Sequence, residues 1–210
     1  AAHETPRRAM CLIAWNWQPG TGLLLLANRD EFYARPTLPL HRWPDADVLA
    51  GKDLQGGGTW LGLGRGGRLA ALTNVRDPQQ LRAEAPTRGT LVADFLRGDM
   101  GAPAYLAQLA PQAAAFNPFN LLLFDGESLL GFESQGTRTL HFQAGVNAVS
   151  NARFNTPWPK LQRLTQALRA RGLPEAVQPH DWLPLLTDTQ TASDADLPAT
   201  GVPLATERAL

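Results

Sequence analysis

The chain has little cysteine, no long apolar run and no excess of charge, and each shortage excludes a class of protein. Its one cysteine can form neither an internal disulfide nor a cysteine-rich zinc site, which favours a reducing, cytoplasmic location. Its apolar runs are far shorter than the ~20 residues of a transmembrane helix. The opening "AAHETPRRAM" lacks the apolar stretch of a secretory signal. Nineteen acidic side chains balance nineteen basic ones, so the overall charge indicates neither nucleic acid nor an anionic membrane as partner.

Proline and glycine, by contrast, are abundant. They number 17 and 19 among 210 residues, which is typical of short strands joined by tight turns rather than of a helical bundle. A chain of this length fits one domain with a substantial core. The many Ala, Leu, Arg and Pro residues suggest a bacterial origin. We therefore expect a single domain built largely from short strands.

Hydrophobic spacing predicts strands first, then helices, then strands and a last helix. Hairpins are predicted over 11–17 with 22–28 and over 60–64 with 68–75, and single strands near Val48 and over 119–125, 128–134, 137–143 and 145–151. Helices are predicted between Pro86 and Gly98 and over 102–109, 157–171 and 181–186. The rest of 41–58 and the tail 188–210 look like loops. This order predicts an α+β fold with two sheets or one large antiparallel sheet.

The stretch "LLLLANRDEFYARP", residues 23–36, runs from an apolar strand straight into Asn28, Arg29, Asp30 and Glu31. Buried charges are unfavourable unless they are paired or take part in function, so we expect these side chains to line a cleft where the strand leaves the core. Arg29 and Asp30 alternate faces on a continuing strand, so both reach the cleft only if the strand bends. Glu31 is expected to pair with a neighbouring arginine such as Arg35. The alternative is a charge network that only fastens the strand end.

Polar residues at strand ends form a combination that suits acyl transfer. Cys11 begins the first strand, Arg29 and Asp30 end its hairpin partner, and Asn74 and Asn151 follow two other strands. A thiolate would attack a carbonyl carbon, and the asparagine amides would donate hydrogen bonds to the oxyanion. Each element also has an ordinary explanation, because a lone cysteine on an apolar strand is usually a packing residue and asparagine at a strand end is usually part of a turn.

Six segments together resemble a known family. They are "MCLIAWNW", "LLLLANRDEFYARP", "GGGTWLGLGRGGRLAALTNVRDP", "RG-LV--FL", "FNLLLFD" and "VSNARFNTPWPKL". They resemble the family named for its Asn-Arg-Asp-Glu tetrapeptide (NRDE), which includes the eukaryotic transport and Golgi organisation protein two. More distantly, the chain is similar to N-terminal-nucleophile hydrolases of the choloylglycine hydrolase group. That resemblance implies a four-layer αββα sandwich, with Cys11 as nucleophile and Arg29, Asp30, Asn74 and Asn151 as its catalytic partners.

Two departures from the hydrolase pattern concern the ends of the chain. In those hydrolases cysteine is the first residue, and its α-amine, with a pKa of ~7.7–8.0, is the general base. Here residues 1–9 precede the domain as an extension, which is a tag, a propeptide or a misplaced start. The NRDE domain is expected over 10–210, without the C-terminal strands with which family members continue. Those strands would otherwise pair a sheet edge.

The family resemblance implies a role in haem trafficking or in acyl-CoA and lipid homeostasis, with no required cofactor and with haem as bound cargo. The ligand would be small and hydrophobic or amphipathic. Of the four histidines, His41 is the best candidate for a haem ligand, and Trp60 is one of several aromatics suited to an apolar pocket. The expected ligand-binding residues are Asn28, Arg29, Asp30, Glu31, His41 and Trp60.

Three functional hypotheses remain open. The protein is a cytosolic binding or trafficking protein, a cysteine amidohydrolase acting on non-peptide C–N bonds, or an interaction module with a vestigial cleft.

Overall fold

The computed structural model describes residues 11–29, 31 and 34–209, which form two compact units. The first unit combines the described residues before position 34 with those from Ala144 onward. The second is Ala34–Gln143, so it is inserted between two halves of the first. No helix among the described residues combines the length and apolarity that crossing a bilayer takes.

The first unit contains a three-stranded antiparallel sheet in the order β10-β1-β2. Its strands are β1 (Leu12–Gln18), β2 (Gly22–Asn28) and β10 (Gly145–Val149). β1 and β2 form a hairpin whose turn is closed by a 2.9 Å bond from Thr21 N to Gln18 O, with Gly20 at φ 75°. Strand β10 joins the other side of β1 from far along the chain, so β1 is the central strand.

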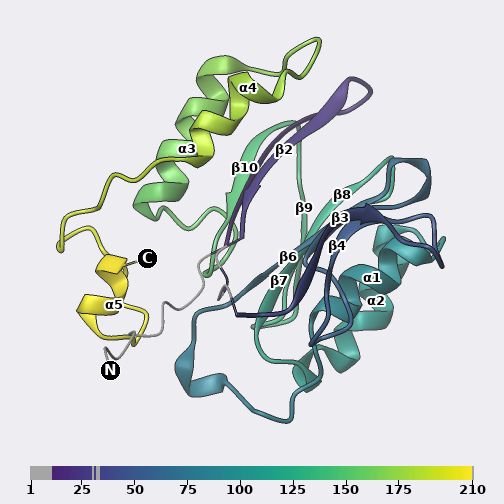
Figure 1. Cartoon of the computed structure of the whole chain (residues 1–210), viewed down its shortest axis with the longest axis horizontal. Helices are drawn as coiled ribbons and strands as arrows, with labels where there is room; N and C mark the ends of the chain where they lie inside the picture. Colours follow the sequence, from purple (N-terminus) through teal and green to yellow (C-terminus); the bar gives the residue numbers. More distant parts are fainter. Residues whose placement is uncertain (1–10, 30, 32–33, 210) are drawn as a thin grey trace. The chain divides into compact units, whose positions relative to one another are not determined.

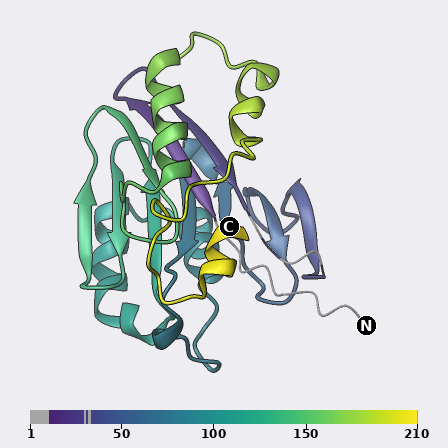
Figure 2. The same ribbon diagram turned by 90° about the vertical axis from the view of Figure 1, so that its left-hand side faces the viewer.

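Helix α3 (Pro159–Arg171) covers one face of this sheet, as Figure 1 shows. Its apolar stripe, Leu161, Leu164 and Leu168, packs with Ala14 and other residues of even position on β1, β2 and β10. The short helices α4 (Pro179–Trp182) and η4 (Leu183–Leu186) follow, and α5 (Leu204–Ala209) ends the described chain. Figure 2 shows α3 running beside the strands that it covers.

The opposite face of the three-stranded sheet is also apolar. Ile13 and Trp15, which point away from α3 because strand side chains alternate, are 0% exposed. Phe154 meets Trp15 edge-on, with ring centroids 6.1 Å apart. Both faces of β1 are therefore buried, which explains why the strand "LIAWNWQ" is apolar almost throughout.

The second unit contains a seven-stranded antiparallel sheet whose strands follow the order of the chain. They are β3 (Thr37–Arg42), β4 (Leu49–Asp53), β5 (Leu61–Leu63), β6 (Leu69–Asn74), β7 (Phe119–Phe124), β8 (Leu129–Glu133) and β9 (Arg138–His141). Helices α1 (Gly89–Arg97) and α2 (Ala102–Leu109) pack on one face of this sheet (Figure 1). Short turns of 3₁₀ helix, η1 (Arg65–Gly67), η2 (Pro78–Gln80) and η3 (Ala110–Ala115), connect these elements.

A row of polar residues crosses the face of the seven-stranded sheet that α1 and α2 leave uncovered. Thr73, Asn120, Glu133 and Arg138 are paired in register across β6, β7, β8 and β9. Asn120 donates to Thr73 Oγ1 over 3.1 Å, and Arg138 donates to both carboxylate oxygens of Glu133 over 2.9 and 3.0 Å. Because the first three residues are at most 2% exposed, these bonds satisfy groups that solvent does not reach.

The α+β class and both predicted hairpins are confirmed, and α2 has the predicted bounds. The αββα order of layers stays a prediction. The loop predicted over 41–58 is wrong at its start, where β3 continues to Arg42, because a bulge and the exposed surface of this edge strand break the alternation. The loop predicted for the tail is wrong over Leu204–Ala209, where the helix α5 is closed by a bond from Glu207 N to Pro203 O.

Candidate functional site

Three strand ends of the first unit bring four polar or reactive residues together, and we call Cys11, Arg29, Ser150 and Asn151 the strand-end cluster. Leu12 pairs with Asn28 across β1 and β2, and continuing this register by one residue places Cys11 opposite Arg29. Ile13 pairs with Val149 across β1 and β10, and continuing that register by two residues places Cys11 opposite Asn151. Three of the five residues predicted as catalytic thus share one sheet end.

The strand-end cluster is largely closed to solvent around its thiol. Cys11 is 8% exposed, Ser150 4% and Asn151 3%. The Ser150 hydroxyl donates to the carbonyl oxygen of Cys11 over 2.8 Å, which fastens the start of β1 to the end of β10. This contact fixes the backbone position from which the thiol projects.

Charged residues follow directly after β2. Arg29 forms an ion pair with Glu31 over 3.4 Å, and the two side chains are 25% and 20% exposed. In the second unit, Arg35 donates from Nε and Nη2 to Asp53 Oδ2 over 3.1 and 2.6 Å. Asp30 lies outside the described residues. Arg29 thus pairs with Glu31, and Arg35 pairs with Asp53.

The remaining predicted residues belong to the second unit. Asn74 is the last residue of β6 and is half-buried. It pairs with Phe119 on the face of the sheet that packs against α1 and α2. His41 lies on β3, with its Nδ1 2.7 Å from the carbonyl oxygen of Pro39. Trp60 is half-buried just before β5. Convergence of Asn74 with Cys11 stays a prediction, and so does ligand binding by His41 and Trp60.

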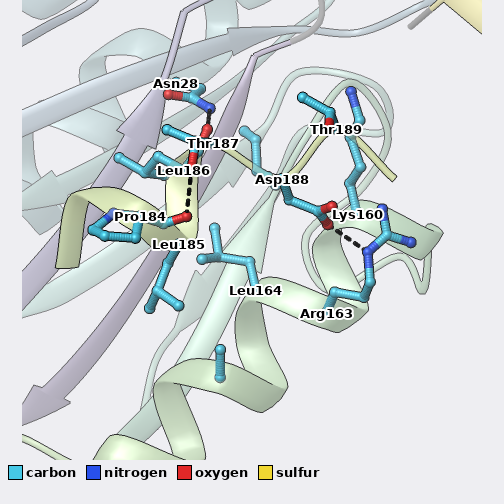
Figure 3. A pocket seen from close by; sticks show the side chains of 12 residues that line it. Asn28, Lys160, Arg163, Leu164, Pro184, Leu185, Leu186, Thr187, Asp188 and Thr189 are labelled. Atoms are coloured by element: carbon cyan, nitrogen blue, oxygen red, sulfur yellow. Dashed lines mark hydrogen bonds and ion pairs between the residues drawn. The ribbon is translucent and has the colours of Figure 1, made fainter. Parts of the chain in front are cut away.

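A pocket of about 500 Å³ opens in the first unit, between α3 and the segment that follows α4. Asn28, the first residue of the NRDE tetrapeptide, lines it and donates from Nδ2 to the carbonyl oxygen of Leu186 over 2.7 Å (Figure 3). Six apolar residues form much of its wall: Leu12, Leu164, Ala167, Pro184, Leu185 and Leu186. This volume is within the usual range for small-molecule sites.

The polar part of the pocket carries two cations and one carboxylate, a formal charge of +1. Arg163 donates from Nε to Asp188 Oδ2 over 2.5 Å and from Nη2 to the carbonyl oxygen of Gln190 over 2.9 Å. Lys160 lies one turn earlier on α3 and also lines the pocket, as Figure 3 shows. The hydrogen bond from Arg163, followed by that from the Gln190 amide, holds the pKa of Asp188 below its usual 3.8. Asp188 is therefore charged at neutral pH.

The pocket and the thiol of the strand-end cluster lie on opposite faces of the three-stranded sheet. Leu12 and Asn28 pair on the face that α3 covers, whereas Cys11 and Arg29 fall on the other face by alternation. The sequence had suggested one shared cleft for Asn28 and Cys11. In the first unit, the register instead separates the residue that lines the pocket from the candidate nucleophile.

Sequence reasoning missed Lys160, Arg163 and Asp188 as pocket residues. The two cations are three residues apart at the start of an amphipathic helix, a spacing that puts them on one face. That spacing was a usable signal for a shared site. Their proximity to Asn28, 132 or more positions earlier, follows only from the tertiary fold.

Comparison with known proteins identifies the family. A family model described as Transport and Golgi organisation 2 matches residues 10–210. The chain belongs to the Transport and Golgi organisation 2 family. The resemblance based on the NRDE tetrapeptide is thereby confirmed.

Three animal proteins named for transport and Golgi organization are similar to the chain. The chain is 38% identical over 186 residues to the Transport and Golgi organization protein 2 homolog of Bos taurus, which covers 79% of this chain and 67% of the relative. It is 34% identical over 210 residues to the Homo sapiens homolog, covering 90% and 74%. For the Drosophila melanogaster protein the values are 42% over 99 residues, covering 41% and 35%. These eukaryotic relatives give no support to a bacterial origin.

Proposed function

We propose that this protein binds and carries a small amphipathic ligand of the acyl-CoA, lipid or haem type in the cytosol. The observation that supports this function is the pocket that Asn28 lines, with an apolar wall and the two cations Lys160 and Arg163. An apolar wall favours a hydrocarbon chain, and the cations favour an anionic head group. The lone cysteine supports the cytosolic location.

The pocket suits an acyl chain better than haem. Haem iron is usually held by His, Cys, Met or Tyr, and none of these is among the residues that line this pocket. Haem therefore remains the second candidate cargo, with His41 as its predicted ligand.

Isothermal titration calorimetry with palmitoyl-CoA tests this function. Ala167 lines the pocket, so Ala167→Trp should fill it and weaken binding by about tenfold or more. Ala170 lies on the same helix, is exposed and does not line the pocket, so Ala170→Trp is the matched control and should bind like the wild type. Absence of palmitoyl-CoA binding by the wild type, or equal weakening by both variants, would contradict an acyl ligand in this pocket.

Haem binding needs its own titration, followed by absorbance in the Soret region. A shift at stoichiometric haem that is lost in His41→Ala would support haem as cargo and His41 as ligand. If the Soret band does not change at stoichiometric protein, haem is excluded as cargo, and the hypothesis of an acyl ligand is unaffected.

The strand-end cluster supports a second candidate, the cysteine amidohydrolase. In a chain that begins at Cys11, the α-amine would serve as base and Arg29 would favour the thiolate. Such a protein should react quickly with iodoacetamide at pH 7, and Arg29→Ala should slow the reaction. Slow alkylation that Arg29→Ala leaves unchanged would mean that Cys11 is a packing residue. If neither ligand binding nor fast alkylation is found, an interaction module becomes the remaining hypothesis.

A further inference from the structure

We propose that residues 187–190, which we call the gate segment, form a gate in the wall of the pocket and that Arg163 is its latch. An anionic head group that enters the pocket opens the gate by taking Arg163 from Asp188. The proposal rests on the proposed ligand-binding function and adds how the same pocket is opened. The experiment below separates failure of the gate from failure of ligand binding itself.

One wall of the pocket is the continuous stretch 184–189, and its two halves are held differently. In the first half, Leu185 and Leu186 pack against the apolar residues between α3 and the sheet. Leu186 also accepts the 2.7 Å bond from Asn28. In the second half, all four residues of the gate segment are exposed. The first half therefore has apolar contacts that hold it, whereas the gate segment depends on polar contacts.

Arg163 supplies the hydrogen bonds that tie the gate segment to α3. It donates from Nε to Asp188 Oδ2 over 2.5 Å and from Nη2 to the carbonyl oxygen of Gln190 over 2.9 Å. The other hydrogen bonds that the structure gives for this segment are local. The Thr187 amide and hydroxyl donate to the carbonyl oxygen of Pro184, and the Gln190 amide donates to Asp188 Oδ1. Loss of the contacts of one side chain would therefore release the gate segment from α3.

An anionic head group in the pocket competes with Asp188 for Arg163. Both residues line the pocket, and Figure 3 shows the Asp188 carboxylate directed at the Arg163 side chain. Nε and Nη2 form an edge of the guanidinium to which a carboxylate or phosphate can bind with two parallel hydrogen bonds, and both atoms now donate to the gate segment. A head group that takes this edge displaces both contacts together, and its charge then repels Asp188.

The gate responds to the charge of the ligand. A neutral amphiphile can lie against Leu164 and Ala167 without competing for Arg163, so it leaves the gate segment in place. Each anionic ligand must displace the same Asp188, so the gate lowers the affinities of all of them by the same factor. Asp188 therefore determines how the pocket responds to an anion rather than which anion it prefers.

Octanoate and 1-octanol are matched probes, because they share a chain length and only octanoate is charged at pH 7. Calorimetry first gives a saturating concentration of each, and NMR then gives the backbone ¹⁵N order parameters of residues 187–190. With octanoate these order parameters should fall by about 0.2, to below about 0.6, the range of flexible backbone. With 1-octanol they should change by less than about 0.05, and the middle of α3 should stay at about 0.85 with both probes.

Two variants test the latch. Arg163→Gln removes the guanidinium, so the gate segment should have order parameters below about 0.6 without ligand, and octanoate should lower them no further. Asp188→Asn removes the competing charge of a partly exposed ion pair, so octanoate should bind about twofold to fivefold more tightly. Binding of 1-octanol should not change in Asp188→Asn. Glu175→Gln, at an exposed carboxylate outside the pocket, is the matched control and should behave like the wild type.

The outcomes separate the gate from the function on which it rests. If the wild type binds neither octanoate nor palmitoyl-CoA, the proposed function fails. If it binds them and the order parameters of residues 187–190 stay the same or rise, only the gate fails. A gate segment that is as ordered in Arg163→Gln as in the wild type would overturn the role of Arg163 as latch.

Discussion

Gly58 and Gly89 meet backbone to backbone. A Cβ atom on Gly58 would lie 2.2 Å from the carbonyl carbon of Gly89, and one on Gly89 would lie 3.1 Å from the carbonyl oxygen of Thr59. The Thr59 amide donates to the Gly89 carbonyl over 3.2 Å. The glycine-rich "GGGTW" stretch therefore allows the chain before β5 to press against the first turn of α1.

Gly58→Ala should lower the free energy of unfolding by about 3 kcal/mol, because backbone atoms on both sides cannot move apart as a flexible side chain could. Gly101→Ala is the control in the same unit, where a Cβ would meet nothing nearer than 3.5 Å. Urea unfolding followed by circular dichroism measures both. Equal midpoints for the two variants would show that the close approach is not restrictive.

Arg68 closes the C-terminal end of α1 from within the core. It is 8% exposed, donates to the carbonyl oxygens of Phe95 and Met100, and stacks 4.0 Å above the Phe95 ring. Arg68→Met should cost about 2–3 kcal/mol of unfolding free energy, because buried carbonyls lose charged donors. Arg65→Met, at an exposed arginine in the adjacent turn, should change stability by less than about 0.5 kcal/mol.

Acid should weaken the second unit partly through Asp125. Partial burial alone would raise the pKa of Asp125, but hydrogen bonds from the amides of Ser128, Ala102 and Glu127 together outweigh it and hold the pKa below 3.8. The ionised form is therefore favoured in the folded state. Its stabilisation is present above the ordinary pKa and is lost as pH falls through the lowered one.

The predicted consequence is that Asp125→Asn is less stable than the wild type by about 1 kcal/mol at pH 7. The difference should shrink as the pH falls below 3.8, the ordinary value of this carboxyl group. Thermal unfolding between pH 2.5 and 7 measures it, with Asp99→Asn at an exposed aspartate as control. A difference that stays constant with pH would show that ionisation of Asp125 contributes nothing.

Asn28 fastens η4 to the end of β2 through its 2.7 Å bond to Leu186. Asn28→Ala should loosen the pocket wall and raise amide hydrogen exchange across residues 183–189 by about fivefold, the effect of losing one hydrogen bond of ~1 kcal/mol. Exchange within the middle of α3 serves as the internal reference and should not change. Unchanged exchange at 183–189 would mean that the segment is held by its apolar contacts alone.

Much of the fold could be predicted from the sequence because buried apolar residues recur along its helices and strands with the period of each element. The α1 stripe, Leu91, Val92, Phe95 and Leu96, is buried as its spacing indicated, and the hairpin of β1 and β2 forms around "QPGT". Strand β3 could not be predicted in this way, because Leu40 is 70% exposed and Pro39 interrupts the alternation of apolar and polar residues. Edge strands lack the two-sided burial that makes a sequence signal clear.

The candidate site could be predicted only in part. The three strand ends that carry Cys11, Arg29 and Asn151 follow from local patterns, and the register of β1 then aligns them. The pocket depends on α3 and η4 packing over that sheet, and such long-range contacts leave no periodic trace in the sequence. That Asn28 and Cys11 lie on opposite faces of the three-stranded sheet could likewise be deduced only from the strand register.

The insertion of the second unit between two halves of the first has a consequence for synthesis on the ribosome. Strand β1 pairs with β10, and the partners Ile13 and Val149 are made 136 positions apart. At about 5–20 residues per second, β1 waits on the order of 10 s for that partner. During this interval the contiguous segment Ala34–Gln143 can fold first, while the apolar hairpin of β1 and β2 remains without its third strand and α3. Nascent chains halted before β10 should therefore engage chaperones through residues 12–28.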